Sequence, residues 1–125
     1  MAQEIVDSLY DANKRTGLEI AQYFRDMEKV IKEMRRVLTV GGRTCIVIGN
    51  TTRHDIKIKC AEVFTEMLKD NKFKVEQIWK RGVGLNSKYL PTIRDVNTGK
   101  FTSLDNKNSK QVYPEEYILI GRKLR

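Results

Sequence analysis

Residues 34–50, MRRVLTVGGRTCIVIGN, constrain the fold more than any other stretch of the sequence. A helical apolar pattern ends at Leu38, and a glycine pair beginning at Gly41 follows, where glycine can take the left-handed conformation that closes a helix. The apolar run at residues 45–48 does not alternate, which is typical of a strand buried on both faces by helices. Because ligands bind at the carboxyl ends of strands in open α/β sheets, we expect a functional edge just after Gly49.

Helical periodicity flanks this strand on both sides. Apolar residues recur every three or four positions through residues 18–38, which predicts an amphipathic helix of about five turns. The segment before it is weakly patterned, and we expect Thr16-Gly17 to break it. A second helical pattern covers residues 58–68. Asn71 follows that helix, and Asn tolerates the left-handed conformation that often ends a helix.

The second half of the chain contains two more predicted strands. Residues 73–79 largely alternate and end near Arg81, whereas residues 117–120 form another unbroken apolar run. Residues 50–55 have the composition of a polar loop, and residues 83–114 form a long basic loop without sustained periodicity. Two strands joined by a loop without a helix predict an antiparallel pair at the end of the domain.

The predicted fold class is α/β, in a single domain that spans residues 1–125. Its elements are helix, strand, helix, strand, long loop and antiparallel strand, which is the back half of a doubly wound sheet. A sheet cut at its middle leaves the strand at residues 44–49 with an unpaired edge and an uncovered apolar face, and such edges pair with other chains. We therefore expect either a missing amino-terminal half or self-association through the exposed sheet edge.

The composition of the chain indicates which kinds of molecule it binds. The formal net charge is +8, which suits a polyanion, most simply nucleic acid, although a basic surface also serves solubility. Cys45 and Cys60 lie in apolar patterns without the spacing of metal ligands, so we expect buried, reduced thiols in a cytoplasmic protein and no metal site. No apolar run approaches the length of a membrane span, and no signal peptide opens the chain.

Two groups of residues are candidates for contact with nucleic acid. The first follows the strand at residues 44–49, where it contacts nucleic acid or a cofactor, or else simply caps the next helix. The second lies in the long loop, where cations neutralise phosphates and an aromatic ring stacks on a flipped base, unless the loop is merely solvated. The two groups are Asn50, Thr51, Thr52 and Arg53, and then Lys88, Tyr89 and Arg94. His54 has no catalytic neighbours in the sequence and is expected to be an exposed loop residue.

Several segments together are similar to one enzyme family. They are the "RVL..GGR" turn at residues 36–43, the strand ending in Gly49-Asn50 with its Thr-rich loop, LPTIRD at residues 90–95 and YPEEY at residues 113–117. They resemble the carboxyl-terminal half of Rossmann-like, S-adenosylmethionine-dependent DNA methyltransferases that methylate exocyclic amines of adenine or cytosine. The resemblance implies a partial Rossmann-like methyltransferase sheet, DNA as partner and S-adenosylmethionine as the cofactor of the complete enzyme.

Two motifs of that family are absent from the sequence. The family binds its cofactor on a glycine-rich loop and holds the amine with an Asp/Asn/Ser-Pro-Pro-aromatic motif. Pro91 and Pro114, the two prolines, are not adjacent, and the G-x-G at residues 82–84 opens no predicted helix. We therefore predict no catalytic or cofactor-binding residue in this chain, and no binding of S-adenosylmethionine by the chain alone. The alternative is a non-catalytic basic α/β module that binds nucleic acid or a protein.

Overall fold

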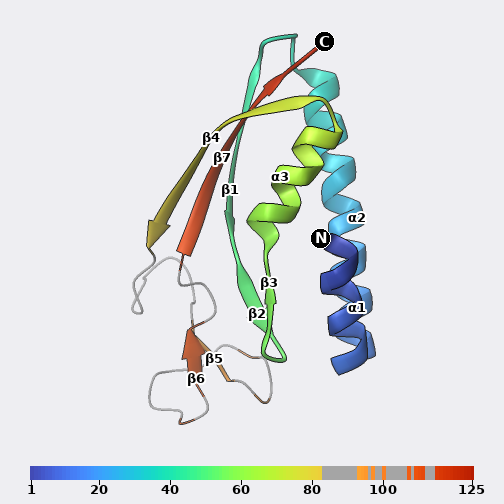
Figure 1. Cartoon of the computed structure of the whole chain (residues 1–125), viewed down its shortest axis with the longest axis vertical. Coiled ribbons are helices and arrows are strands. Elements are labelled where there is room, and N and C mark those ends of the chain that lie inside the picture. The colour runs from blue at the N-terminus through green and yellow to red at the C-terminus, as the bar shows by residue number, and fades with distance from the viewer. Residues whose placement is uncertain (83–92, 96, 98–99, 101–106, 108, 112–114) are drawn as a thin grey trace.

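The computed structural model describes residues 1–82, 93–95, 97, 100, 107, 109–111 and 115–125 (Figure 1). The helices are α1 (Ala2–Ala12), α2 (Lys14–Val37) and α3 (Cys60–Asp70). The strands are β1 (Arg43–Gly49), β2 (Thr51–Arg53), β3 (Ile56–Ile58), β4 (Phe73–Gly82), β5 (Ile93–Asp95), β6 (Ser109–Gln111) and β7 (Glu115–Lys123).

A three-stranded sheet in the order β1-β7-β4 organises the molecule. β7 runs antiparallel to both neighbours, so β1 and β4 are parallel to each other and their carboxyl ends share one edge. Leu119 marks the register, because it pairs with Ile46 on one side and Ile78 on the other. This confirms the mixed α/β class and the antiparallel last strand. The pairs β2-β3 and β5-β6 form separate two-stranded sheets toward the opposite end from the C-terminus (Figure 1).

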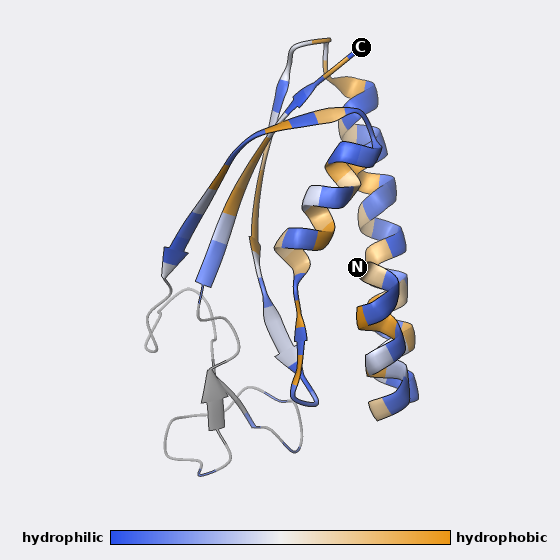
Figure 2. Ribbon diagram, in the orientation of Figure 1, coloured by the Kyte–Doolittle hydropathy of each residue, from blue (hydrophilic) through white to orange (hydrophobic). Residues whose placement is uncertain are grey.

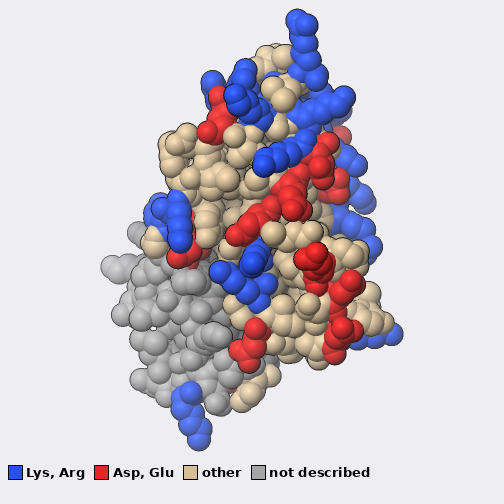
Figure 3. Space-filling view, in the orientation of Figure 1, with Lys and Arg blue, Asp and Glu red and all other residues tan. Residues whose placement is uncertain are grey.

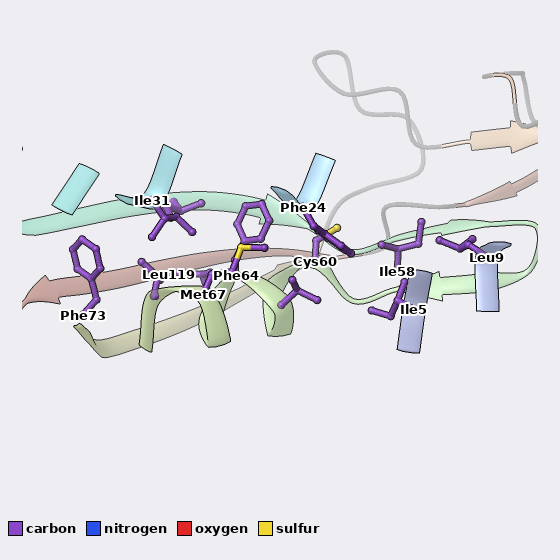
Figure 4. Packing of buried hydrophobic residues seen from close by; sticks show 13 residues of the cluster. Ile5, Leu9, Phe24, Ile31, Ile58, Cys60, Phe64, Met67, Phe73 and Leu119 are labelled. Carbon is purple, nitrogen blue, oxygen red and sulfur yellow. The ribbon is translucent and has the colours of Figure 1, made fainter. Parts of the chain in front are cut away.

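The helices lie on one face of the central sheet and enclose the core between them (Figures 1 and 4). The strands supply alternate residues to this face, as the pleat of a β-strand requires. α2 and α3 contribute apolar residues at helical spacing from the other side. The fully buried large side chains come from α1, α2, β3, α3 and β7: Leu9, Ile31, Ile58, Val63, Phe64, Leu68 and Leu119.

The first correction concerns the start of the helical region. Thr16-Gly17 does not break a helix, because α2 begins at Lys14 and runs through both residues. Asn13 begins α2 by accepting a hydrogen bond on its side chain from the Thr16 N–H at 3.1 Å. Gly17 is needed for packing, since a Cβ there would lie 2.6 Å from the Cα of Tyr10 in α1. The glycine therefore marks a close approach of two helices and not a helix end.

The second correction concerns burial of β1. The sequence predicted a strand buried on both faces, but Val47 is 54% exposed and Cys45 is also exposed. In the part of the chain that the structure describes, helices cover only the face that carries Ile46. We call the opposite face of the sheet the outer face. There Val47 of β1 pairs with Ile118 of β7, and Ile118 pairs with Trp79 of β4. Trp79 is 53% exposed. An apolar row therefore crosses the sheet on this outer face, and Figure 2 shows hydrophobic stretches along β1 and β7.

Three local predictions also need correction. Residues 50–55 are not simply a loop, because they include β2 and the turn to β3, and Ile58 belongs to β3 instead of a helix. The predicted loop at residues 83–114 contains β5 and β6 among its described residues. Asn71 is not left-handed (φ −99°), whereas Lys72 is (φ 61°). Asn71 instead donates from its side chain to the Met67 carbonyl at 2.8 Å, which caps α3 without that conformation.

Candidate nucleic-acid interface

Asn50 links the carboxyl end of β1 to the start of α3. Its Oδ1 accepts from the backbone N–H of Ala61 at 2.9 Å, and its Nδ2 donates to Glu62 Oε2 at 3.4 Å. The residue at the N-cap position of α3, Lys59, makes no side-chain cap, so Asn50 satisfies an orphan N–H of the first turn from outside the helix. Asn50 is 5% exposed. The capping alternative is thus realised, and contact of Asn50 with nucleic acid stays a prediction with little surface available for it.

The β2-β3 hairpin carries the next predicted contacts, Thr51, Thr52 and Arg53, each partly exposed. Its turn residues, His54 and Asp55, have φ of 51° and 59°, which matches the right-handed twist of a tight hairpin. His54 is exposed, as predicted.

Two contacts fasten this hairpin to α2. His54 Nε2 lies 3.0 Å from the Oγ1 of buried Thr16, and Arg53 Nη1 lies 3.5 Å from Glu19 Oε2. Ile58 of β3 anchors the other side in the core beside α1. These contacts hold the hairpin against α1 and α2 beside the carboxyl end of β1. The ion pair with Glu19 partly neutralises the charge of Arg53.

The long-loop candidates are only partly within the described residues. Lys88 and Tyr89 lie outside them. Arg94 lies in β5, where its backbone is in register with that of Lys110 in β6. Asp95 accepts a hydrogen bond from the Asn97 N–H at 2.8 Å, which stabilises the chain just after β5. In Figure 1, β5 and β6 lie toward the same end of the molecule as the β2-β3 hairpin.

A charged network that sequence reasoning missed lies where β4 ends and β7 begins. Lys80 Nζ and the Tyr117 hydroxyl both contact Glu115, each at 3.0 Å, and Arg81 pairs with Glu116. The hydrogen bond from Lys80 and then that from Tyr117 lower the pKa of Glu115. Partial burial, followed by the hydrogen bond to Glu115, raises the pKa of Tyr117. Glu115 is therefore an anion and Tyr117 a neutral donor at physiological pH, which suits positioning more than proton transfer.

A small apolar hollow adjoins this network. Its volume is about 200 Å³, and Ala61, Glu62, Thr65, Ile78 and Tyr117 line it. Most small-molecule sites occupy roughly 300–1,000 Å³, so the hollow is small for a nucleotide-sized cofactor. YPEEY, one of the segments quoted for the resemblance, was the available signal for this region, although nothing in it indicated that Tyr117 would meet Lys80.

Within the described ranges, no cluster of three or more His, Cys, Asp or Glu side chains is placed to hold a metal ion. No helix in the same part of the chain is long and apolar enough to cross a membrane.

Comparison with known proteins shows what this geometry belongs to. The family model described as DNA methylase, of the N6 and N4 type, matches residues 5–123. Two crystal structures of a protein classed as a DNA modification methylase in Thermus thermophilus share the fold. The selenomethionine derivative has a TM-score of 0.59 and 17% sequence identity, and the complex with S-adenosyl-L-methionine has a TM-score of 0.51 and 19% identity. No curated protein sequence matches the chain.

The matches cover 90% of this chain but only 42% and 39% of the two methylase chains. The chain therefore spans about two fifths of the length of the methylase it resembles. The mixed α/β fold is therefore similar to that of a DNA modification methylase. This chain belongs to the DNA methylase family, in its exocyclic-amine group.

Proposed function

We propose that this chain is the carboxyl-terminal portion of a DNA methyltransferase that acts on an exocyclic amine of adenine or cytosine. In this proposal the order β1-β7-β4 is the distal part of a Rossmann-like sheet, and another segment completes it. The observation that carries the proposal is the family match together with a sheet covered on one face only. In this proposal the complete enzyme uses S-adenosylmethionine and acts in the cytoplasm.

The other segment supplies the chemistry. The glycine-rich loop and the Pro-Pro-aromatic motif are absent from this sequence, and the hollow beside Tyr117, of about 200 Å³, is small for a nucleotide-sized cofactor. The carboxylate of Glu115 accepts a hydrogen bond from Tyr117 and pairs with Lys80, so these three side chains already contact one another. We assign this chain the role of holding DNA and completing the sheet, while bond making occurs on residues of the other segment.

DNA contacts in this proposal come from two segments, the β2-β3 hairpin and the long loop. The β2-β3 hairpin presents Thr51, Thr52 and Arg53, and the long loop contributes Lys88, Tyr89 and Arg94. Phosphate contacts of this kind position a duplex without reading its sequence. The predicted stacking of Tyr89 on a flipped base adds the aromatic surface that enzymes use when they act on a base outside the helix.

The test of the whole proposal is reconstitution. This chain is co-expressed with a segment of a related DNA methylase that carries the glycine-rich loop and the Pro-Pro-aromatic motif. Transfer of a tritiated methyl group from S-adenosylmethionine to duplex DNA is then measured. We expect transfer only when both parts are present, and weak or no binding of S-adenosylmethionine to this chain alone by calorimetry. Saturable binding of the cofactor to the isolated chain at micromolar concentration would contradict the proposal.

The loop assignment has its own test. In the reconstituted enzyme, Lys88→Ala and Arg94→Ala should each weaken DNA binding and make the plot of log affinity against log salt shallower by about one unit, because one phosphate contact is lost. Arg25→Ala, on the exposed face of α2, is the control and should leave the slope unchanged. If all three variants keep the wild-type slope, the loop is a solvated basic segment.

The second candidate function is a non-catalytic basic module that binds nucleic acid. The observation in its favour is that the chain builds its own apolar core from residues of all three helices and the sheet. Under this alternative the isolated chain is a stable monomer, and its DNA affinity does not change when the second segment is added.

A further inference from the structure

Much of the chain's excess of positive over negative charge lies away from the predicted interface. Lysine and arginine side chains gather at the end of the molecule that carries the C-terminus, where β1 and β4 begin and β7 ends (Figure 3). We call this group the basic cap: Lys32, Arg35, Arg36, Arg43, Lys69, Lys72, Lys74, Arg122, Lys123 and Arg125. The carboxylates within the same three segments, residues 32–43, 69–76 and 122–125, are Glu33, Asp70 and Glu76. The cap thus holds nearly all of the chain's excess of cations.

On the outer face, the basic cap contains three positively charged residues on adjacent strands. Arg122 of β7 pairs with Arg43 of β1 on one side and with Lys74 of β4 on the other. Like charges directly opposite each other destabilise a sheet. Among the described residues, Glu76 pairs with two of these three cations: its two oxygens lie 2.6 Å from Arg43 Nε and 3.6 Å from Arg122 Nε. Arg43 first, and then the charges of Arg122 and Lys74, lower the pKa of Glu76. One anion therefore faces three cations.

On the helix side, a hollow of about 310 Å³ adds three further cations. Lys32 and Arg35 of α2 and Lys72 of the α3–β4 turn line it together with Asp70 and Asn71. Among the described residues, none of the three cations forms an ion pair, although Asp70 shares the same hollow. Arg35 Nε is shielded from solvent and has no hydrogen-bond partner, and its Nη2 makes only a long contact, 3.5 Å, with the Leu124 carbonyl. An unsatisfied polar group of this kind costs stability unless a ligand meets it.

We infer that the basic cap binds the phosphate backbone of duplex DNA, as a second surface separate from the predicted interface at the hairpin and long loop. Repeated cations that lack protein partners suit a polyanion with evenly spaced charges. The cap segments carry Phe73 as their aromatic residue, and Phe73 is 2% exposed, so the cap has no ring to stack on a base. It therefore binds without sequence preference and holds DNA beyond the target site. This inference goes beyond the proposed function, because it concerns residues at the opposite end of β1.

The experiment measures binding of the full chain to a fluorescent duplex of random sequence, about 20 base pairs long, by anisotropy at several salt concentrations. The cap variant is Lys32→Gln, Arg35→Gln and Lys72→Gln together. The control, Lys14→Gln, Arg15→Gln and Arg25→Gln, removes the same charge from the other half of α2. We expect the cap variant to lose at least about tenfold in affinity and two to three units of salt slope, and the control to lose about twofold or less. Equal losses in the two triple variants would overturn the inference, since net charge alone would explain them.

Two additions make the result decisive. Because Arg35 is partly buried, the double variant Lys32→Gln, Lys72→Gln is compared with Lys14→Gln, Arg25→Gln if the triple variant unfolds. Competition with polyglutamate of matched charge then tests the partner. Displacement of DNA by polyglutamate at equal charge concentration would overturn the assignment to nucleic acid and indicate an acidic protein. The methyl-transfer test of the proposed function does not involve cap residues, so either proposal can fail while the other stands.

Discussion

Asn50 is one side chain on which two elements depend. It accepts the hydrogen bond that would otherwise be missing at the start of α3, and it does so from the end of β1. Asn50→Ala leaves the Ala61 N–H buried without this partner, so the chain should lose about 1–2 kcal/mol of unfolding free energy in urea. Thr52→Ala, two residues along on the partly exposed hairpin, is the matched control and should cost well under half of that. Equal losses would show that α3 does not depend on the bond.

Cys60 gives the protein a pH dependence in the alkaline range. Burial, and then the nearby charge of Glu62, raises the pKa of its thiol from 9.0 to about 11. The folded chain therefore keeps a proton that the unfolded chain loses, so this contribution to stability is complete below pH 9 and disappears as the pH rises through 11. The loss should reach about 2–3 kcal/mol.

The measurement compares two single-cysteine variants in urea at pH 8 to 11, within the window set by that shift. Cys45→Ala keeps Cys60 and should show the alkaline loss. Cys60→Ala should show a flatter profile, and other titrations in this range cancel in the comparison. Identical profiles would mean that Cys60 is ionised as easily in the folded state as in the unfolded state.

At the scale of elements, the packing of α1 on α2 reverses a general rule. Alanine is usually more stable than glycine inside a helix by about 1 kcal/mol. In α2, however, a Cβ at position 17 meets the Tyr10 backbone at 2.6 Å. Gly17→Ala should therefore destabilise the chain by about 1–3 kcal/mol, because α1 must move away. Thermal unfolding followed by circular dichroism checks the sign, and a raised midpoint would contradict the helix contact.

Periodicity predicted an element well where the apolar residues of its pattern are also the residues that the fold buries. The apolar spacing of residues 18–38 predicted the body of α2, because that face meets the sheet directly. The same spacing failed at its start, where Gly17 serves a contact with α1 that lies outside the local pattern. Ile58 was assigned to a helix because its position fits the period of α3, while its burial in β3 comes from the tertiary packing of the hairpin against α1.

In the candidate site, too, local sequence predicted some features, whereas others depend on the tertiary structure. Asn50 was identified as a residue at the functional edge or a helix cap, and both readings follow from its place after a strand. Lys80 and Tyr117 meet only because β4 and β7 pair in one register, and a single sequence does not contain that register. The concentration of charge in the basic cap was also invisible, since its residues come from three distant segments.

At the scale of the whole molecule, the unbroken apolar run at residues 45–48 was correctly taken as a strand and wrongly taken as fully buried. The run is apolar on both faces, yet the helices of this chain cover one face. A continuous apolar strand of this kind is typical of sheets with helices on both sides. The exposed Val47 and Trp79 are therefore the clearest indication that a further layer belongs on the outer face.

Sedimentation velocity of the wild-type chain across a range of micromolar concentrations tests this claim most directly, with Val47→Lys and Trp79→Lys as comparison variants. Because both side chains are more than half exposed, lysine at either position should leave the fold intact. We predict that the wild-type chain self-associates as its concentration rises, that both variants stay monomeric with unchanged circular dichroism, and that the β1 edge adds to the contact. A folded wild-type monomer that persists at high micromolar concentration would contradict the account and favour the independent binding module.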